Sequence, residues 1–220
     1  MKLLLTSAGI TNQKIADALF EMTNKPASEL KVAFIPTAAN VEEGNKTDWF
    51  FRQYEELRQF GIEWINMIDF AAADVDWQAR LEECDVLYLT GGNTFYLLDQ
   101  VRRQGFDIYL EKALKEKVYV GGSASSILVT PSINVANIPP GDPNLPRLKD
   151  FTGLGYVDFE IEPHCDKDRF ETVKEYALSR QNAVYALDDA SAIKVIDGKA
   201  TVVSEGEWDY FEGGINKEEQ

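Results

Sequence analysis

One serine in this chain lies in a segment suited to nucleophilic catalysis. Residues 118–120 (Val-Tyr-Val) predict a short buried strand, residues 121–126 (Gly-Gly-Ser-Ala-Ser-Ser) follow at once, and an apolar run begins at Ile127. A serine on a sharp turn between a strand and a helix is typical of a nucleophile elbow. Small residues allow the strained turn, and the helix directs its first amides at the same point. We therefore expect Ser123 to be a nucleophile with an unusual backbone conformation.

The base for that serine must come from elsewhere in the chain. A serine hydroxyl is a weak nucleophile unless a base accepts its proton, and near neutral pH that base is usually an imidazole. His164 is the only histidine, so its ring should lie ~2.6–3.2 Å from the Ser123 hydroxyl. A non-catalytic interpretation of both residues also stays open, in which Ser123 caps a helix and His164 is a surface residue.

Composition narrows the class of protein. The chain has 220 residues, is 45% hydrophobic and carries a net charge of −15. Its length suits a single domain over residues 1–220 with a sizeable core, with residues 217–220 as a frayed tail. The negative charge argues against nucleic acid and anionic membranes as partners, and no apolar run is long enough to span a bilayer.

The cysteines and acidic residues suggest neither a disulfide framework nor a metal site. Cys84 and Cys165 are too few for such a framework, and reduced thiols favour a cytoplasmic location. We expect both to be packed thiols without a catalytic role. With one histidine and scattered carboxylates, no spacing indicates metal ligands, so we expect neither a metal nor another cofactor.

Strands and helices alternate over the first 122 residues. Strands are expected at residues 3–6, 32–35, 64–68, 86–89 and 118–120, and helices at residues 13–22, 48–60, 76–83, 94–103 and 106–117. This alternation predicts an α/β fold of three layers, a mostly parallel sheet with helices on both faces. Ligands bind at the carboxyl ends of such strands, where Gly9, Pro36, Gly91 and Ser123 lie.

The last third of the chain is less regular. Residues 134–155 contain four of the eight prolines and predict a long loop. Residues 156–161 alternate like a strand that would deliver His164 at its end. A helix is expected at 169–179, a strand at 184–187, and a hairpin formed by 192–196 and 200–203 around Asp197-Gly198.

Several of these segments together resemble the peptidase E family of serine peptidases. The segments are Thr6-Ser7-Ala8-Gly9, Phe34-Ile35-Pro36-Thr37-Ala38, Gly91-Gly92-Asn93-Thr94-Phe95, Gly121-Gly122-Ser123-Ala124 and Pro163-His164. The family includes aspartyl dipeptidases and cyanophycinases, and its fold is similar to that of class I glutamine amidotransferases. The resemblance implies that Ser123 is the nucleophile, that His164 is its base, and that the amides of Gly92 and Ala124 form the oxyanion hole.

The chain departs from the family pattern at two positions. The family elbow is usually Gly-x-Ser-Ala-Gly, and Ser125 stands at the last position here; we expect Ser125→Gly to leave activity equal or higher. The family completes its triad with a glutamate, and in the matching stretch Asp189 takes that place. Aspartate can orient an imidazole as well. The neighbouring Asp188 remains an alternative to Asp189 as the third member of the triad. In a non-catalytic interpretation, both aspartates lie in a solvated turn.

The resemblance implies a hydrolase that cleaves small peptides through an acyl-enzyme, with N-terminal aspartyl dipeptides as one substrate class. A substrate aspartate needs a cation, for which Arg169 is the candidate, and Asn93 and Thr94 could contact polar groups of the substrate. Two alternatives remain: a non-catalytic binding protein of the same fold, which Ser125 and Asp189 favour, and an esterase with the same triad. The sequence leaves the oligomeric state open, a homodimer included.

Overall fold

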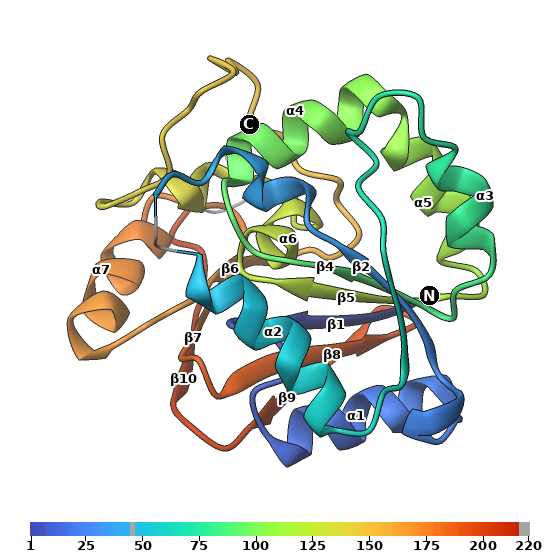
Figure 1. The fold of residues 1–220 in the computed structure, drawn as a ribbon. Helices are drawn as coiled ribbons and strands as arrows, with labels where there is room; N and C mark the ends of the chain where they lie inside the picture. Colours follow the sequence, from blue (N-terminus) through green and yellow to red (C-terminus); the bar gives the residue numbers. More distant parts are fainter. Residues whose placement is uncertain (45–46, 216–220) are drawn as a thin grey trace.

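The carboxyl ends of the parallel strands form one edge of a large central sheet (Figure 1). A computed structural model describes residues 1–44 and 47–215. In this part of the chain the large sheet has seven strands in the order β3-β2-β4-β5-β1-β8-β9. They are β1 (Lys2–Thr6), β2 (Lys31–Ile35), β3 (Trp64–Met67), β4 (Val86–Leu89), β5 (Val118–Gly122), β8 (Ser191–Ile196) and β9 (Lys199–Ser204). The first five are parallel, whereas β8 and β9 form the expected hairpin and add antiparallel strands at one side.

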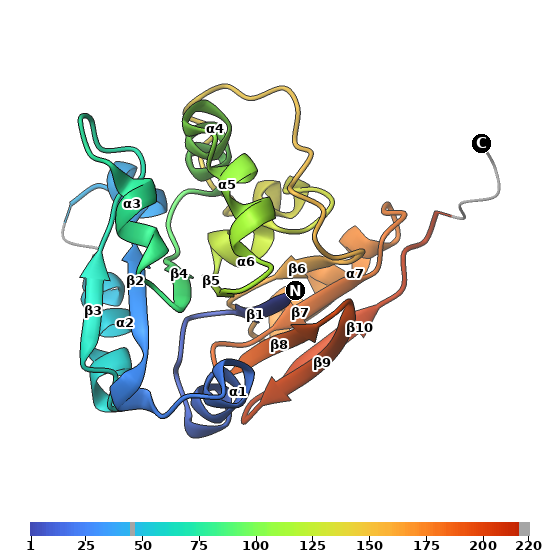
Figure 2. The ribbon, with the colours of Figure 1, turned by 90° about the vertical axis from the view of Figure 1, so that its right-hand side faces the viewer.

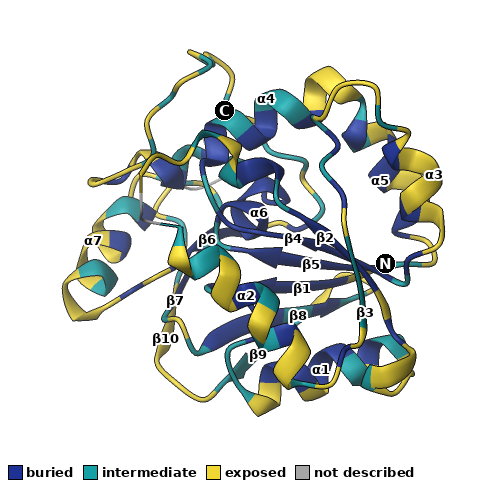
Figure 3. Cartoon of the chain, in the orientation of Figure 1, coloured by how far each residue is buried: buried dark blue, intermediate teal, exposed yellow. Residues whose placement is uncertain are grey.

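Helices cover both faces of this sheet, as the alternating pattern predicts. Successive strand residues point to opposite faces, so Leu3 and Leu5 pack in one core and Leu4 in the other. One face is covered by α1 (Gln13–Thr23) and α2 (Asp48–Gln59), and the other by α3 (Trp77–Glu82), α4 (Thr94–Gln104), α5 (Phe106–Ala113) and α6 (Ala124–Leu128). Figure 2 shows α1 below the sheet and α4, α5 and α6 above it, and Figure 3 shows the buried strands between these layers.

A second, smaller sheet carries the segment that ends in His164. It consists of β6 (Glu160–Glu162), β7 (Val184–Leu187) and β10 (Trp208–Phe211), in the order β10-β7-β6, and α7 (Lys167–Ala177) packs against it. The strand expected at 156–161 is shorter in the structure, where β6 begins only at Glu160. The Tyr156 amide donates to the Val129 carbonyl, just after α6, and not to a neighbouring strand. Strand β10 was not expected from the sequence; it pairs antiparallel with β7.

Other boundaries differ by small amounts. Helix α5 ends at Ala113 rather than at 117, and the Lys117 ammonium then donates to the Glu82 and Cys84 carbonyls. The 134–155 loop holds one short 3₁₀ helix, Asn134–Asn137, and two others occur at Ala27–Glu29 and Thr37–Val41. The expected frayed tail at 217–220 lies outside the described residues. Among the described helices, none has the length and apolar character needed to cross a membrane.

Candidate active site

Ser123 lies on a strained turn between β5 and α6. Its backbone angles are φ 51° and ψ −113°, a region that residues with side chains rarely occupy. The turn is tight because Gly121 has no side chain: a Cβ there would lie 2.8 Å from the Ser126 nitrogen. The geometry is that of the elbow expected from the sequence.

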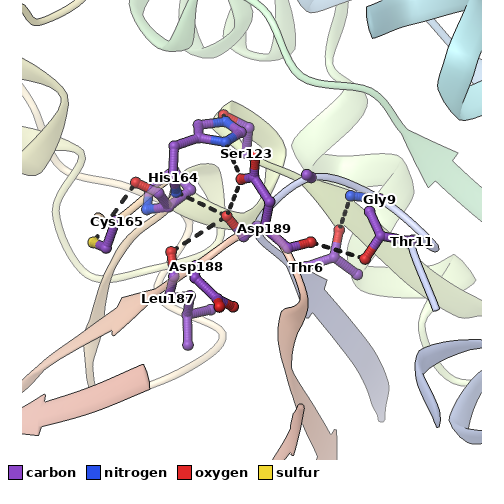
Figure 4. A network of polar contacts seen from close by, with 12 residues as sticks. Thr6, Gly9, Thr11, Ser123, His164, Cys165, Leu187, Asp188 and Asp189 are labelled. Carbon is purple, nitrogen blue, oxygen red and sulfur yellow. Dashed lines mark hydrogen bonds and ion pairs between the residues drawn. The ribbon is translucent and has the colours of Figure 1, made fainter. Parts of the chain in front are cut away.

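His164 lies between the Ser123 hydroxyl and a carboxylate (Figure 4). Its Nε2 is 2.9 Å from Ser123 Oγ, and its Nδ1 is 2.6 Å from Asp189 Oδ1. These lengths are those of hydrogen bonds through which a carboxylate orients an imidazole and the imidazole accepts a serine proton. The hydrogen bond from His164 is the main reason that the pKa of Asp189 lies below its ordinary value. Asp189 is therefore ionised at neutral pH, as this role requires.

The two adjacent aspartates have different roles. The Asp188 carboxylate accepts hydrogen bonds from the Ala190 amide, the Ser191 hydroxyl and the Glu207 amide. It therefore holds the turn between β7 and β8, while Asp189 faces His164. Asp142, another acid on a loop near the site, accepts from the Thr94 amide at 2.7 Å.

Ser7, just after β1, contacts both the backbone of His164 and the carboxylate that binds the His164 ring. Its hydroxyl oxygen accepts a hydrogen bond from the His164 backbone amide at 2.8 Å and its O–H lies 3.2 Å from Asp189 Oδ1. Ser7 is fully buried. His164 itself adopts φ 59°, so this contact holds it in a backbone conformation that is unfavourable in isolation.

The Gly92 and Ala124 amides are available to bind an oxyanion. Ala124 is the first residue of α6, and neither amide donates a hydrogen bond within the described part of the chain. Gly92 has φ 132°, and a Cβ there would lie 2.3 Å from the Ala38 carbonyl oxygen. Only glycine fits this turn. A Cβ at Gly91 would lie 3.2 Å from that of Ser123, so the turn passes directly beside the nucleophile.

Ser125, the departure from the family elbow, is fully buried. Its hydroxyl donates to the Thr90 carbonyl at 2.5 Å. Thr90 immediately precedes Gly91, so Ser125 connects the helix after the nucleophile with the Gly91-Gly92 turn. The close approach between β5 and α6 is provided by Gly121 instead, where a Cβ would lie 2.9 Å from the Ser125 carbonyl.

Two cavities adjoin Ser123. The α7 cavity, of about 500 Å³, is lined by Thr94, Asp142, Glu162, Asp166, Asp168 and Arg169 among others. The α2 cavity, of about 430 Å³, is lined by Glu42, Trp49, Arg52, Gln53, Glu56 and Asp189 among others. Ser123, His164, Gly92 and Asp142 line both. Each cavity therefore provides space next to the Ser123 side chain.

Comparison with known proteins identifies the family of this chain. The model of peptidase family S51 matches residues 3–203. This chain belongs to peptidase family S51. A peptidase of Listeria innocua, Lin0382, is 30% identical over 189 residues, which cover 76% of this chain and 86% of that protein. Peptidase E of Streptomyces coelicolor is 31% identical over 147 residues, covering 62% of this chain and 59% of that protein.

Solved structures give the same result for the fold. The crystal structure of a peptidase E-type protein from Listeria monocytogenes superposes with a TM-score of 0.76 at 25% identity, over 93% of this chain and 98% of the other. A peptidase from an acI-B1 Actinobacterium has a TM-score of 0.65 at 17% identity and shares the fold. The S51 family comprises serine-type peptidases, so the chain is a serine-type peptidase with the expected peptidase E fold, consistent with a class I glutamine amidotransferase-like architecture.

Of the residues expected to bind substrate in this S51 peptidase, some line a cavity and others are buried. Thr94 and Arg169 line the α7 cavity. The structure does not support the expectation that Asn93 contacts the substrate, because the residue is only 2% exposed. Its side-chain oxygen caps α4 by accepting from the Tyr96 amide, and its side-chain nitrogen donates to the Pro143 carbonyl. Its side chain is therefore committed to the protein.

Arg169 is also largely engaged. Its guanidinium pairs with Glu162, which is buried, and donates to the Pro139 carbonyl at 2.6 Å and the Ile138 carbonyl at 3.2 Å. Most of its five donors are used. Arg169 thus ties α7 to the 134–155 loop and has little capacity left for a substrate carboxylate.

The two cysteine thiols are not suited to act as nucleophiles near neutral pH. Burial raises the pKa of Cys84 to about 11 and that of Cys165 to about 12, so neither thiol ionises near neutral pH. Among residues 1–44 and 47–215, no group of three or more His, Cys, Asp or Glu side chains could hold a metal ion. Sequence reasoning missed Ser7, Gln53 and Glu56; of these only Ser7 had a signal, its position just after a strand in a segment shared with the family.

Proposed function

We propose that this S51 peptidase hydrolyses amide bonds in small peptides with Ser123, His164 and Asp189 as its catalytic residues. The observation that carries the proposal is the chain of two short contacts, 2.9 Å from Ser123 Oγ to His164 Nε2 and 2.6 Å from Nδ1 to Asp189. A serine in this arrangement has a base, and the base has an orienting anion.

Acylation follows from the positions of these atoms. Ser123 Oγ attacks the carbonyl carbon of the substrate, and its proton passes to His164 Nε2. The carbonyl oxygen becomes an oxyanion, which the Gly92 and Ala124 amides stabilise. The C–N bond then breaks as Nε2 returns the proton to the departing amine, and the acyl group stays on Ser123.

Deacylation repeats the sequence with water. Water attacks the ester carbon while His164 accepts its proton, the bond to Ser123 Oγ breaks, and Oγ regains a proton from Nε2. The product acid leaves and the enzyme is restored. Asp189 keeps its negative charge throughout and stabilises the imidazolium that forms twice in the cycle.

The arginine expected to bind an aspartyl substrate is already engaged within the protein. An N-terminal aspartyl substrate would need a free cation beside Ser123. Arg169, the candidate for that role, is paired with Glu162 and two carbonyls. We therefore infer that Arg169 does not bind a substrate carboxylate in this chain; Arg52, which lines the α2 cavity with Ser123, is the other guanidinium among the residues lining the two cavities. The cytoplasmic location stays a prediction from the sequence.

A fluorophosphonate probe tests the nucleophile, because it labels only an activated serine. We expect labelling at Ser123 and none in Ser123→Ala or His164→Ala. Absence of labelling in the folded wild-type protein would favour the non-catalytic alternative.

A panel of dipeptides beside matched esters then distinguishes a peptidase from an esterase. Hydrolysis of the esters alone would contradict the proposal.

A further inference from the structure

Two residues that line the α2 cavity, Gln53 and Glu56, carry buried acceptors to which no described residue donates. Gln53, on α2, is 5% exposed and lines this cavity. Its Nε2 donates to the Ala8 carbonyl at 3.0 Å, which fixes the orientation of the amide. No described residue donates a hydrogen bond to its buried Oε1, and the same holds for Oε2 of Glu56, one helical turn further along α2. The Tyr88 hydroxyl, which lies with the Gln53 side chain around Gly9, is also unpaired among the residues that the structure describes and bonds to neither acceptor. Buried acceptors are normally paired, so we infer that the two atoms accept from a donor that binds in the cavity.

The charge of the cavity specifies the kind of donor. Its lining includes four carboxylates, Glu42, Glu56, Asp142 and Asp189, against one guanidinium, Arg52. Burial raises the pKa of Glu56 to about 7, and Asp189 adds to this effect while Arg52 opposes it. Burial and then Asp142 also raise the pKa of Glu42. A cation placed here would relieve the repulsion between these carboxylates.

The cavity is close enough to the nucleophile to hold part of a substrate. A Cβ built on Gly122, the residue before Ser123, would lie 3.3 Å from the Gln53 amide nitrogen. Ser123 and His164 line the cavity together with Gln53 and Glu56. A group that extends from a carbonyl bound at Ser123 therefore enters the cavity that Gln53 and Glu56 line. Gln53 Oε1 and Glu56 Oε2 are themselves buried, so binding requires these two side chains to turn toward the cavity.

We propose that the α2 cavity is a subsite for an ammonium group of the substrate, bound by Gln53 Oε1 and the Glu56 carboxylate. That the occupant is a substrate rests on the proposed function; that the cavity binds an ammonium group does not. The group can be a lysine side chain or a peptide N-terminus. Charge-assisted hydrogen bonds are stronger than neutral ones, so the ammonium group contributes to affinity as well as to orientation.

The first test compares two fluorophosphonate probes of equal length, one ending in an ammonium group and one in a methyl group. We expect the ammonium probe to label Ser123 at least about tenfold faster. Glu56→Gln should remove most of this preference. Glu55→Gln is the matched control, because Glu55 is an exposed neighbour on α2 that lines neither cavity; it makes the same charge change and should keep the preference.

The second test measures binding without chemistry. In Ser123→Ala, calorimetry compares Ala-Lys, Ala-norleucine and their N-acetyl forms. Weaker binding of the norleucine peptide assigns the cavity to a side chain, and weaker binding of the acetylated peptide assigns it to the N-terminus; either effect must disappear with Glu56→Gln. Equal binding of all four peptides, or a preference that survives Glu56→Gln, overturns the proposal.

The two tests separate the subsite from the proposed function. If neither probe labels the wild-type protein but the ammonium preference in binding persists, the hydrolytic function is wrong and the subsite stands. If both probes label Ser123 at equal rates and binding shows no preference, the serine mechanism stands and the subsite is wrong.

Discussion

The Ser7 hydroxyl accepts a hydrogen bond from the backbone amide of His164 at 2.8 Å, although 157 positions separate the two residues. The same hydroxyl lies 3.2 Å from Asp189. The end of β1 thus fixes both the backbone of the base and the carboxylate that orients it. Ser7 does not touch the nucleophile, so it acts as a positioning residue.

Removing this hydroxyl should affect catalysis more than binding. We expect Ser7→Ala to lower kcat by about 10- to 100-fold with little change in KM, because His164 would lose its fixed position. The pH profile of kcat/KM should also shift, since Asp189 would lose one of its donors. Thr130→Val removes another fully buried hydroxyl and is the control. An unchanged profile in Ser7→Ala would show that the contact is structural only.

The nucleophile and base should act as a unit. We expect Ser123→Ala and His164→Ala each to lower kcat/KM on the order of 10⁴-fold or more, and the double variant to lower it little further. Steady-state hydrolysis of a dipeptide substrate measures this. Unchanged hydrolysis by Ser123→Ala would exclude the serine mechanism.

The adjacent aspartates should separate activity from stability. Asp189→Ala should reduce kcat by about 10²- to 10⁴-fold, less than loss of Ser123 or His164, because it removes the anion that orients His164. Asp188→Ala should lower the free energy of unfolding by about 1–3 kcal/mol, because it leaves the Ala190 and Glu207 amides without their acceptor, with a much smaller effect on kcat. Urea unfolding and steady-state kinetics on both variants measure these effects. A large loss of kcat in Asp188→Ala, with a small loss in Asp189→Ala, would show that the two roles are exchanged.

The structure changes the expectation for Ser125→Gly. From the sequence, glycine at this position should leave activity equal or higher. The Ser125 hydroxyl, however, donates to the buried Thr90 carbonyl beside the oxyanion turn. We now expect Ser125→Gly to lower the free energy of unfolding by about 1–3 kcal/mol and not to raise kcat. Ser125→Ala, measured by the same urea titration, separates the lost hydrogen bond from the added backbone freedom. A Ser125→Gly variant with unchanged stability and a higher kcat would contradict this prediction and agree with the one made from the sequence.

The preference for an ammonium group should depend on pH. Burial raises the pKa of Glu56 from 4.5 to about 7 in the folded protein. The carboxylate is therefore protonated at low pH and becomes ionised as the pH rises through this value. We expect the ratio of labelling rates, ammonium probe over methyl probe, to increase from about pH 6 to about pH 8. Taking the ratio cancels the titration of His164, which both probes share. A flat ratio would mean that Glu56 does not contact the ammonium group.

The sequence by itself determined the fold class and predicted the pair Ser123 and His164, whose Oγ and Nε2 lie 2.9 Å apart in the structure. Strands such as Val86–Leu89 are apolar throughout and the helices between them are amphipathic, a local pattern that dictates a parallel sheet with covered faces. The small residues around Ser123 dictate a sharp turn for the same local reason. Since the chain has one histidine, the partner of Ser123 needed no tertiary information.

Tertiary structure decided the residues that surround this pair. Asp188 and Asp189 are adjacent in sequence, and only the path of the chain after β7 places one on His164 and the other on the turn into β8. The engagement of Arg169 by Glu162 and two loop carbonyls is equally invisible in the sequence, because it depends on where the 134–155 loop crosses α7. The unpaired acceptors of Gln53 and Glu56 follow from the same cause: whether a polar atom has a partner is set by contacts between distant segments, which no local pattern encodes.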